Sequence, residues 1–129
     1  MYIIYNFLVL CECCLFVLPY FLCRCICEAG FTTRMRQSLG GLRDEEIASV
    51  AQKDCIWIHG ASVGEIVATS PLVKEIRKAY PDSPILVSAV TVGGYNMAKQ
   101  IIQEADAIIY FPLDMPFVSE SFVKRIQPR

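Results

Sequence analysis

The stretch "DCIWIHGASVGEIVATSPLVKEI", residues 54 to 76, decides the fold of the chain. Its apolar run "CIWI" ends in His-Gly, which predicts a buried strand over residues 54 to 61. From Ser62 to Tyr80 apolar residues recur at helical spacing, and "YPDSP" ends the pattern. The stretch therefore predicts a strand, a glycine-containing turn and a helix. The helix positions expected to face inward are Ile66, Val67, Leu72, Val73, Ile76 and Ala79.

The same alternation repeats twice along the chain. We expect strands over residues 84 to 91 and 107 to 111, and helices over residues 94 to 104 and 114 to 126. Nearly continuous apolar strands that alternate with helices predict an α/β fold with a parallel sheet, the start of a doubly wound domain. The inward positions expected for the two helices are Met97, Ile101 and Ile102, then Phe117, Val118, Phe122 and Ile126.

The first part of the chain is more apolar than the rest. Residues 2 to 23 are apolar apart from Asn6 and Glu12, and the segment is close to the ~20 residues that cross a bilayer as a helix. Basic residues follow it, so the positive-inside rule places the remainder in the cytoplasm. We expect one uncleaved membrane anchor over residues 1 to 27, with a helix lying in the interface as the alternative. Residues 28 to 53 are expected to be a basic connector with one short helix.

Charge and cysteine usage exclude several classes of protein. The chain has 12 basic and 13 acidic residues, so no overall basic field recruits nucleic acid. Of its 7 cysteines, all but Cys55 lie in or beside the apolar segment, and no second Cys/His pair completes a zinc spacing. We therefore expect no metal site and no nucleic-acid partner.

Glu65 has two interpretations from the residues alone. Ser62-Val63-Gly64-Glu65 matches S-x-x-E, a capping box in which Ser62 accepts from the N–H of residue 65 and Glu65 accepts from the N–H of residue 62. The turn also lies beyond the carboxyl end of a parallel strand, where ligands bind, and the helix start offers free N–H groups to a phosphate. Glu65 is thus expected to be a cap, a functional carboxylate or both. His59 is more typical of a structural group than of a base.

Several ordered segments resemble one known family. "IWIHGASVGEIVATSPLVKEIRKAYPDSPILVSAVTVGGYNMAKQ" is similar to the N-terminal domain of the 3-deoxy-D-manno-octulosonic acid (Kdo) transferases, which carry an H-x-x-S-V-G-E segment followed by a Pro-Leu helix and a Tyr-Pro turn. "IIYFPLDMPFVSESFVKRIQP" resembles the family's Tyr/Phe-Pro-x-Asp-x-Pro segment, and "RMRQSLGGL" is a weaker match to its basic stretch. The resemblance covers residues 34 to 128.

The resemblance implies an inverting, metal-independent glycosyltransferase of lipopolysaccharide biosynthesis. The family has the GT-B architecture of two facing Rossmann-like domains, and it transfers Kdo from CMP-Kdo to the lipid A precursor at the cytoplasmic face of the bacterial inner membrane. By this likeness Glu65 matches the general base that deprotonates the acceptor hydroxyl, which a carboxylate within hydrogen-bond reach can do. Ser62, Val63 and Gly64 are implied to hold the acceptor, and no cofactor is implied.

The sequence also departs from the family pattern. It has "SAVTVGG" where a Thr-x-Thr-x-Thr-Gly-like loop is common, and it ends before the family's Glu-Thr-Glu-Leu-Trp segment and donor domain. Residues 54 to 129 are therefore expected to be a truncated Rossmann-like acceptor domain that lacks the CMP-Kdo site and is inactive alone. Two alternatives stay open: a non-catalytic, membrane-anchored module that binds anionic lipid, or one that binds a nucleotide.

Overall fold

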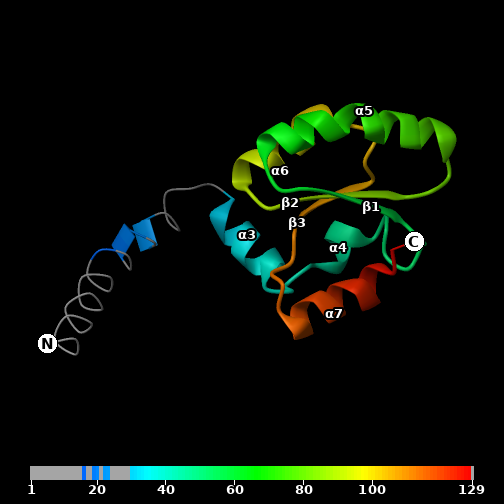
Figure 1. Ribbon diagram of the computed structural model, residues 1–129. Coiled ribbons are helices and arrows are strands. Elements are labelled where there is room, and N and C mark those ends of the chain that lie inside the picture. The colour runs from blue at the N-terminus through cyan, green and yellow to red at the C-terminus, as the bar shows by residue number, and fades with distance from the viewer. Residues whose placement is uncertain (1–15, 17–18, 21, 24–29, 129) are drawn as a thin grey trace, which may run out of the picture. The chain divides into compact units, whose positions relative to one another are not determined.

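The computed structural model describes residues 16, 19–20, 22–23 and 30–128 (Figure 1). The chain divides into two compact units, Met1–Thr32 and Thr33–Arg129, and the second contains the sheet. Most of the membrane anchor expected over residues 1 to 27 lies outside the described residues. Within the described ranges, the structure has no helix of the length and apolar character needed to cross a membrane.

The expected alternation of strands and helices is confirmed. The strands are β1 (Ile56–Gly60), β2 (Ile85–Ala89) and β3 (Ala107–Tyr110), and the helices that follow them are α5 (Val63–Ala79), α6 (Val92–Ile101) and α7 (Pro116–Ile126). Helix α6 begins two residues earlier than predicted because Thr91 caps it: the Thr91 hydroxyl accepts from the N–H of Gly94 at 3.0 Å. Proline at the first position of α7 suits a helix start.

The three strands form one parallel sheet in the order β1-β2-β3. Ile56 is paired with Ile85 at the start of β1, and Leu86 with Ala107 at the start of β3. All five residues of the central strand β2 are buried. The structure therefore confirms the α/β class and the parallel arrangement.

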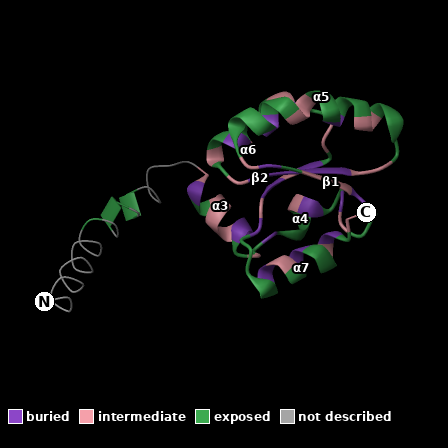
Figure 2. Ribbon diagram, in the orientation of Figure 1, coloured by how far each residue is buried: buried purple, intermediate pink, exposed green. Residues whose placement is uncertain are grey.

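Helices cover both faces of the sheet (Figure 1). On one face, α5 and α6 pack over the β2 residues Ile85 and Val87, and on the other, α7 packs over Leu86. Figure 2 shows β2 buried between these two layers, whereas β1 is only partly buried. A parallel sheet is stable when both faces are covered, so each helix is needed to exclude water from the strands.

Residues expected to form a polar connector contribute to the core. The described part of that stretch holds two helices, α3 (Phe31–Ser38) and α4 (Asp44–Ile47). Leu42, Ile47 and Val50 are buried in the same cluster as α7. The globular unit therefore includes residues 33 to 53, because their apolar side chains help to cover the α7 face of the sheet.

Some helix positions expected to face inward are exposed. Phe117 is 86% exposed, whereas Val118, Phe122 and Ile126 are buried at successive four-residue steps along α7. The sequence predicted four inward positions on α7. Because α7 contacts its neighbours on one side only, it buries one narrow stripe, which leaves Phe117 out. For the same reason α5 buries Ile66 and Val73 and leaves three predicted positions in solvent. These are Val67, Leu72 and Ala79.

Helix α3 is joined to the rest of the unit by polar contacts. Buried Gln37 accepts a hydrogen bond from the N–H of Tyr110 at 2.8 Å, and the Arg36 guanidinium pairs with the Glu46 carboxylate. Burial alone would raise the pKa of Glu46. Hydrogen bonds from Arg36, Arg43 and Gln37 outweigh burial and lower that pKa from 4.5 to about 2.

This low pKa predicts how stability changes in acid. Because the folded pKa of Glu46 lies below its unfolded value, its contribution is fully present above pH 4.5 and is lost as the pH falls toward about 2. Glu46→Gln should lower the free energy of unfolding at neutral pH and flatten its decrease between these pH values, as measured by urea denaturation. The matched control is Glu120→Gln, an exposed partner of Lys124. An unchanged acid slope in Glu46→Gln would contradict the assignment.

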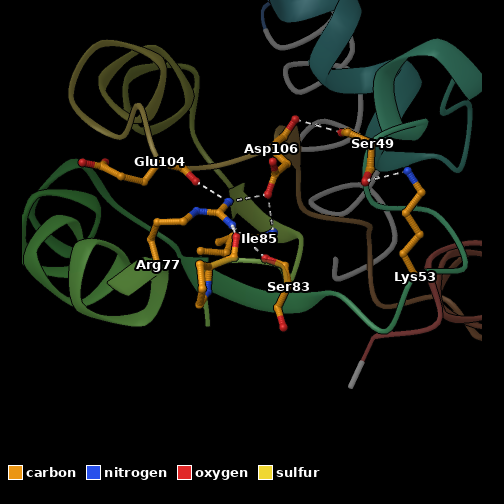
Figure 3. A network of polar contacts seen from close by, with 8 residues as sticks. Ser49, Lys53, Arg77, Ser83, Ile85, Glu104 and Asp106 are labelled. Carbon is orange, nitrogen blue, oxygen red and sulfur yellow. Dashed lines mark hydrogen bonds and ion pairs between the residues drawn. The ribbon is translucent and has the colours of Figure 1, made fainter. Parts of the chain in front are cut away.

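A second polar network joins the end of α5 to the loops that lead into β2 and β3 (Figure 3). The Arg77 guanidinium, near the end of α5, donates to acceptors in the two loops that lead into these strands. Asp106 also accepts from the N–H of Ile85 at 2.7 Å. The acceptors of Arg77 are the carbonyl oxygens of Pro81 (3.0 Å), Ser83 (2.9 Å) and Glu104 (2.8 Å) and the carboxylate of Asp106.

Arg77→Ala should lower the free energy of unfolding by about 2 kcal/mol, because it leaves several partly buried acceptors without a donor. Lys78→Ala removes the neighbouring, exposed cation and should leave the free energy nearly unchanged. Urea denaturation at pH 7 measures both variants. Equal losses in the two variants would show that the network does not hold the loops.

Candidate functional site

The turn between β1 and α5 is built on a close approach at Gly60. A Cβ at this position would lie 2.8 Å from Cδ1 of Ile66, which is itself fully buried in the first turn of α5. A larger residue here would push the Ile66 side chain out of its packed position, so glycine suits the close start of α5 at the end of β1. The result is a helix start at the carboxyl end of the strand, the edge at which open parallel sheets bind ligands.

The predicted capping box is half confirmed. Ser62 is the N-cap, and its hydroxyl accepts from the N–H of Glu65 at 3.3 Å. The return bond differs from the prediction, because Oε2 of Glu65 accepts from the N–H of Ala61 at 2.7 Å and not from that of Ser62. The carboxylate thus reaches one residue further back and holds the end of the strand against the helix start.

One oxygen of the Glu65 carboxylate, Oε1, is available for another partner. The residue is exposed, and among the residues that the structure describes none bonds to its Oε1 atom. A carboxylate fixed through one oxygen keeps the other free to accept a proton from a hydroxyl group placed beside it. Capping and proton transfer are therefore compatible in this geometry.

The start of α6 lies beside the start of α5. A Cβ on Gly93 would be 3.2 Å from Cγ2 of Val63, and one on Gly94 would be 3.6 Å from the carbonyl carbon of Ser62. These glycines allow the two helix starts to meet, so free N–H groups of both helices lie at one edge of the sheet. Such an arrangement favours an anionic group.

The structure thus places Ser62, Val63, Gly64 and Glu65 at the start of α5, and it puts the start of α6 beside this candidate site. Sequence reasoning did not place Thr91, Gly93 or Gly94 there. The signal was present: "TVG" follows β2 as "SVG" follows β1, and in both the hydroxyl residue is the N-cap. Two similar turns after adjacent parallel strands must lie side by side.

The His59 side chain contacts residues in β2 and directly after β3. Its Nδ1 atom is 3.0 Å from the Ser88 hydroxyl, which also accepts from Nε1 of Trp57 at 2.9 Å, and its ring packs 4.2 Å from that of Phe111. These contacts agree with the structural interpretation of His59. In the part of the chain that the structure describes, no three His, Cys, Asp or Glu side chains group as metal ligands.

Fold and turn together define the class: an α/β domain in which two capped helix starts and an exposed carboxylate lie at the carboxyl ends of the strands. The family described as 3-deoxy-D-manno-octulosonic-acid transferase (kdotransferase) matches residues 33–129. The match covers well over half of the chain. The chain therefore belongs to this glycosyltransferase family, as the sequence resemblance predicted.

Similar proteins carry the same description. The 3-deoxy-D-manno-octulosonic acid transferase of Haemophilus influenzae is 35% identical over 82 residues, which are 64% of this chain and 19% of that protein. The Rickettsia felis protein of the same name is 30% identical over 101 residues, 78% of this chain and 22% of that protein. A probable mitochondrial 3-deoxy-D-manno-octulosonic acid transferase of Arabidopsis thaliana is 27% identical over 73 residues, 57% of this chain and 16% of that protein. The chain spans about a fifth of the length of these relatives.

The two glycines of the turn should respond differently to alanine. A Cβ on Gly64 would have only the Ser62 hydroxyl near it, at 4.0 Å, so Gly64→Ala should raise the free energy of unfolding by about 0.5 to 1 kcal/mol. Gly60→Ala should lower it by about 1 to 3 kcal/mol, because Ile66 leaves no room. Urea denaturation measures both. A destabilising Gly64→Ala would show that this glycine serves the fold and not an approaching ligand.

Proposed function

We propose that the chain supplies the acceptor side of an inverting Kdo transferase, which moves Kdo from CMP-Kdo to the lipid A precursor. Family membership supports the reaction class. The observation that carries the proposal is the exposed Glu65 carboxylate, which is fixed through Oε2 and has no described partner at Oε1. An inverting displacement needs a base on the acceptor side, and Glu65 has the position and the free oxygen for that role.

In this proposal Ser62, Val63 and Gly64 bind the acceptor. They form the exposed start of α5, and the start of α6 lies beside them. The positive ends of two helices would hold an acceptor phosphate and bring its sugar hydroxyl toward Glu65. Binding by the backbone explains why a small residue stands at Gly64, where the fold itself would accept a side chain.

The finer architecture belongs to the same proposal. The three parallel strands covered on both faces agree with the N-terminal, Rossmann-like half of a GT-B enzyme. The donor CMP-Kdo would bind in a second domain outside these residues, so we expect the isolated chain to transfer no sugar. No metal or other cofactor takes part in this scheme.

We further propose that residues 2 to 23 anchor the protein in the bacterial inner membrane, with the globular unit on the cytoplasmic side. The length and apolar character of this segment and the basic residues after it support the anchor. Attachment to the membrane would keep the acceptor turn close to a lipid substrate. This proposal rests on the sequence of the segment.

The catalytic role of Glu65 can be measured in a chimaera. The counterpart of residues 33 to 128 in the Haemophilus influenzae relative is replaced by this chain's residues, and Kdo transfer from CMP-Kdo to a lipid A precursor is followed. Glu65→Gln should lower kcat by about 10²- to 10⁴-fold, because the amide cannot accept the proton. Glu75→Gln, an exposed change on the same helix, should leave kcat unchanged. Full activity of the Glu65→Gln chimaera would refute the role.

A second function is favoured by one observation, the meeting of two helix starts. Such an edge can bind an anion without doing chemistry, as in a non-catalytic, membrane-anchored module for anionic lipid or for the phosphate of a nucleotide. Two results together would support this alternative. The full chain would bind the phosphorylated lipid equally well with and without Glu65→Gln, and the chimaera would transfer no Kdo. If the chimaera transfers Kdo and Glu65→Gln abolishes this activity, the non-catalytic alternative is excluded.

A further inference from the structure

Three polar side chains on the α7 face of the sheet form one hydrogen-bonded chain. Trp57 and His59 lie on β1, two residues apart, and Ser88 lies opposite His59 in the register of β2. The Ser88 hydroxyl is 2.9 Å from Nε1 of Trp57 and 3.0 Å from Nδ1 of His59. Ser88 is fully buried in the central strand, so its hydroxyl group needs protein partners such as these.

This chain fixes the position of the proton on His59. The indole N–H of Trp57 can only donate, so the Ser88 oxygen accepts from it. The Ser88 proton then needs an acceptor, and among the residues that the structure describes Nδ1 of His59 is the only further group bonded to that hydroxyl. Because Nδ1 accepts, the proton of the neutral imidazole lies on Nε2. His59 therefore presents an N–H donor on the side of its ring away from Ser88.

Ring contacts hold His59 in place while leaving it accessible. The centroid of its ring is 4.2 Å from that of Phe111, and the Trp57 ring lies 6.0 Å from the same phenylalanine. His59 nevertheless remains exposed to solvent. A donor whose tautomer and orientation are both fixed, and which still reaches solvent, is suited to bind a ligand.

His59 borders a cavity of about 490 Å³ between β1 and α7. Most of its wall is aromatic or apolar, with Trp57, Phe111 and Val123 among the lining residues. Asp114 supplies the only carboxylate among the described lining residues. Ser119 also lines the cavity, but its hydroxyl donates to the carbonyl of Leu113 at 3.4 Å. One fixed donor and one carboxylate are thus the main polar groups of an otherwise apolar wall.

These groups together select the chemistry of a ligand. The Asp114 carboxylate repels a phosphate or a carboxylate. An organic cation would suit Asp114 and the aromatic rings, but it offers no acceptor to the N–H of His59. A hydroxyl group both accepts and donates, so a ligand with several hydroxyls satisfies His59 and Asp114 at once. A pyranose ring carries such hydroxyls and also has C–H faces that pack against aromatic rings.

We propose that the cavity between β1 and α7 binds a neutral pyranose sugar. One sugar hydroxyl accepts from Nε2–H of His59, another donates to Asp114, and the sugar ring packs against Trp57 and Phe111. The cavity lies on the α7 face of the sheet, whereas the helices of the proposed acceptor turn, α5 and α6, cover the other face (Figure 1). The inference therefore goes beyond Kdo transfer and does not depend on Glu65.

The tautomer is tested first. ¹⁵N NMR of the full chain, in a zwitterionic detergent without a sugar headgroup and at mildly alkaline pH, reads the protonation of both nitrogens of the only histidine. We expect a protonated Nε2 and an unprotonated Nδ1. Ser88→Ala should let the two tautomers mix, because Nδ1 loses its donor. A protonated Nδ1 in the unchanged chain would overturn the proposal.

Binding is then measured by titration with the methyl pyranosides of glucose, galactose and mannose, followed by NMR at the indole N–H of Trp57. At least one sugar should bind with a dissociation constant in the millimolar range. Tetrahydropyran, the same ring without hydroxyls, should bind at least about tenfold more weakly, because it leaves His59 and Asp114 without partners. If no sugar binds, or if tetrahydropyran binds equally well, the proposal is wrong.

Matched variants separate ligand binding from a structural role, and amides of β2 report that each variant is folded. His59→Phe keeps a ring beside Phe111 and should weaken sugar binding by about tenfold while leaving tetrahydropyran binding unchanged. Asp114→Ala should have a similar effect. Asp82→Ala, an exposed position outside the cavity, should have none. Equal losses for the sugar and for tetrahydropyran in His59→Phe would overturn the proposal in favour of a structural role.

Discussion

The structure depends on one constraint: a parallel sheet must be covered on both of its faces. Strand β2 is buried throughout, and helices on either side exclude water from it. The constraint explains why residues before β1, with Leu42, Ile47 and Val50 among them, join the core when their polar composition indicated a connector. It also explains why α7 lies on the face opposite α5 and α6, where the sheet needs a second cover.

The site follows from the same arrangement. Because α5 and α6 cover the sheet, α5 packs closely against the end of β1 at Gly60. The start of α6 lies beside the start of α5 at Gly93 and Gly94. Two helix starts and the Glu65 carboxylate then share one edge. Glu65 uses one oxygen for the end of β1, so the contact that stabilises the turn also orients the group proposed to act as a base.

The sequence could predict much of this because its local signals agree. Apolar runs, glycines and prolines located three strands and three helices, and the Ser62 cap was found with its partner. Where prediction was wrong, the missing information was spatial. Phe117 and Leu72 fit a helical period as well as their buried neighbours do, but only the direction of the adjacent layer decides which stripe is covered. The return bond of Glu65 to Ala61 likewise depends on side-chain reach in three dimensions.

The sequence by itself determined the order of the elements, the α/β class, the family and the identity of Glu65 as the residue of interest, because each depends on residue types at short spacing. Tertiary structure alone decided that the α6 start lies beside the α5 start, that His59 contacts Ser88 and Phe111, and that Gln37 accepts from the N–H of Tyr110. These features join residues far apart in the chain. Their contacts exist only once the layers have packed, so no local pattern encodes them.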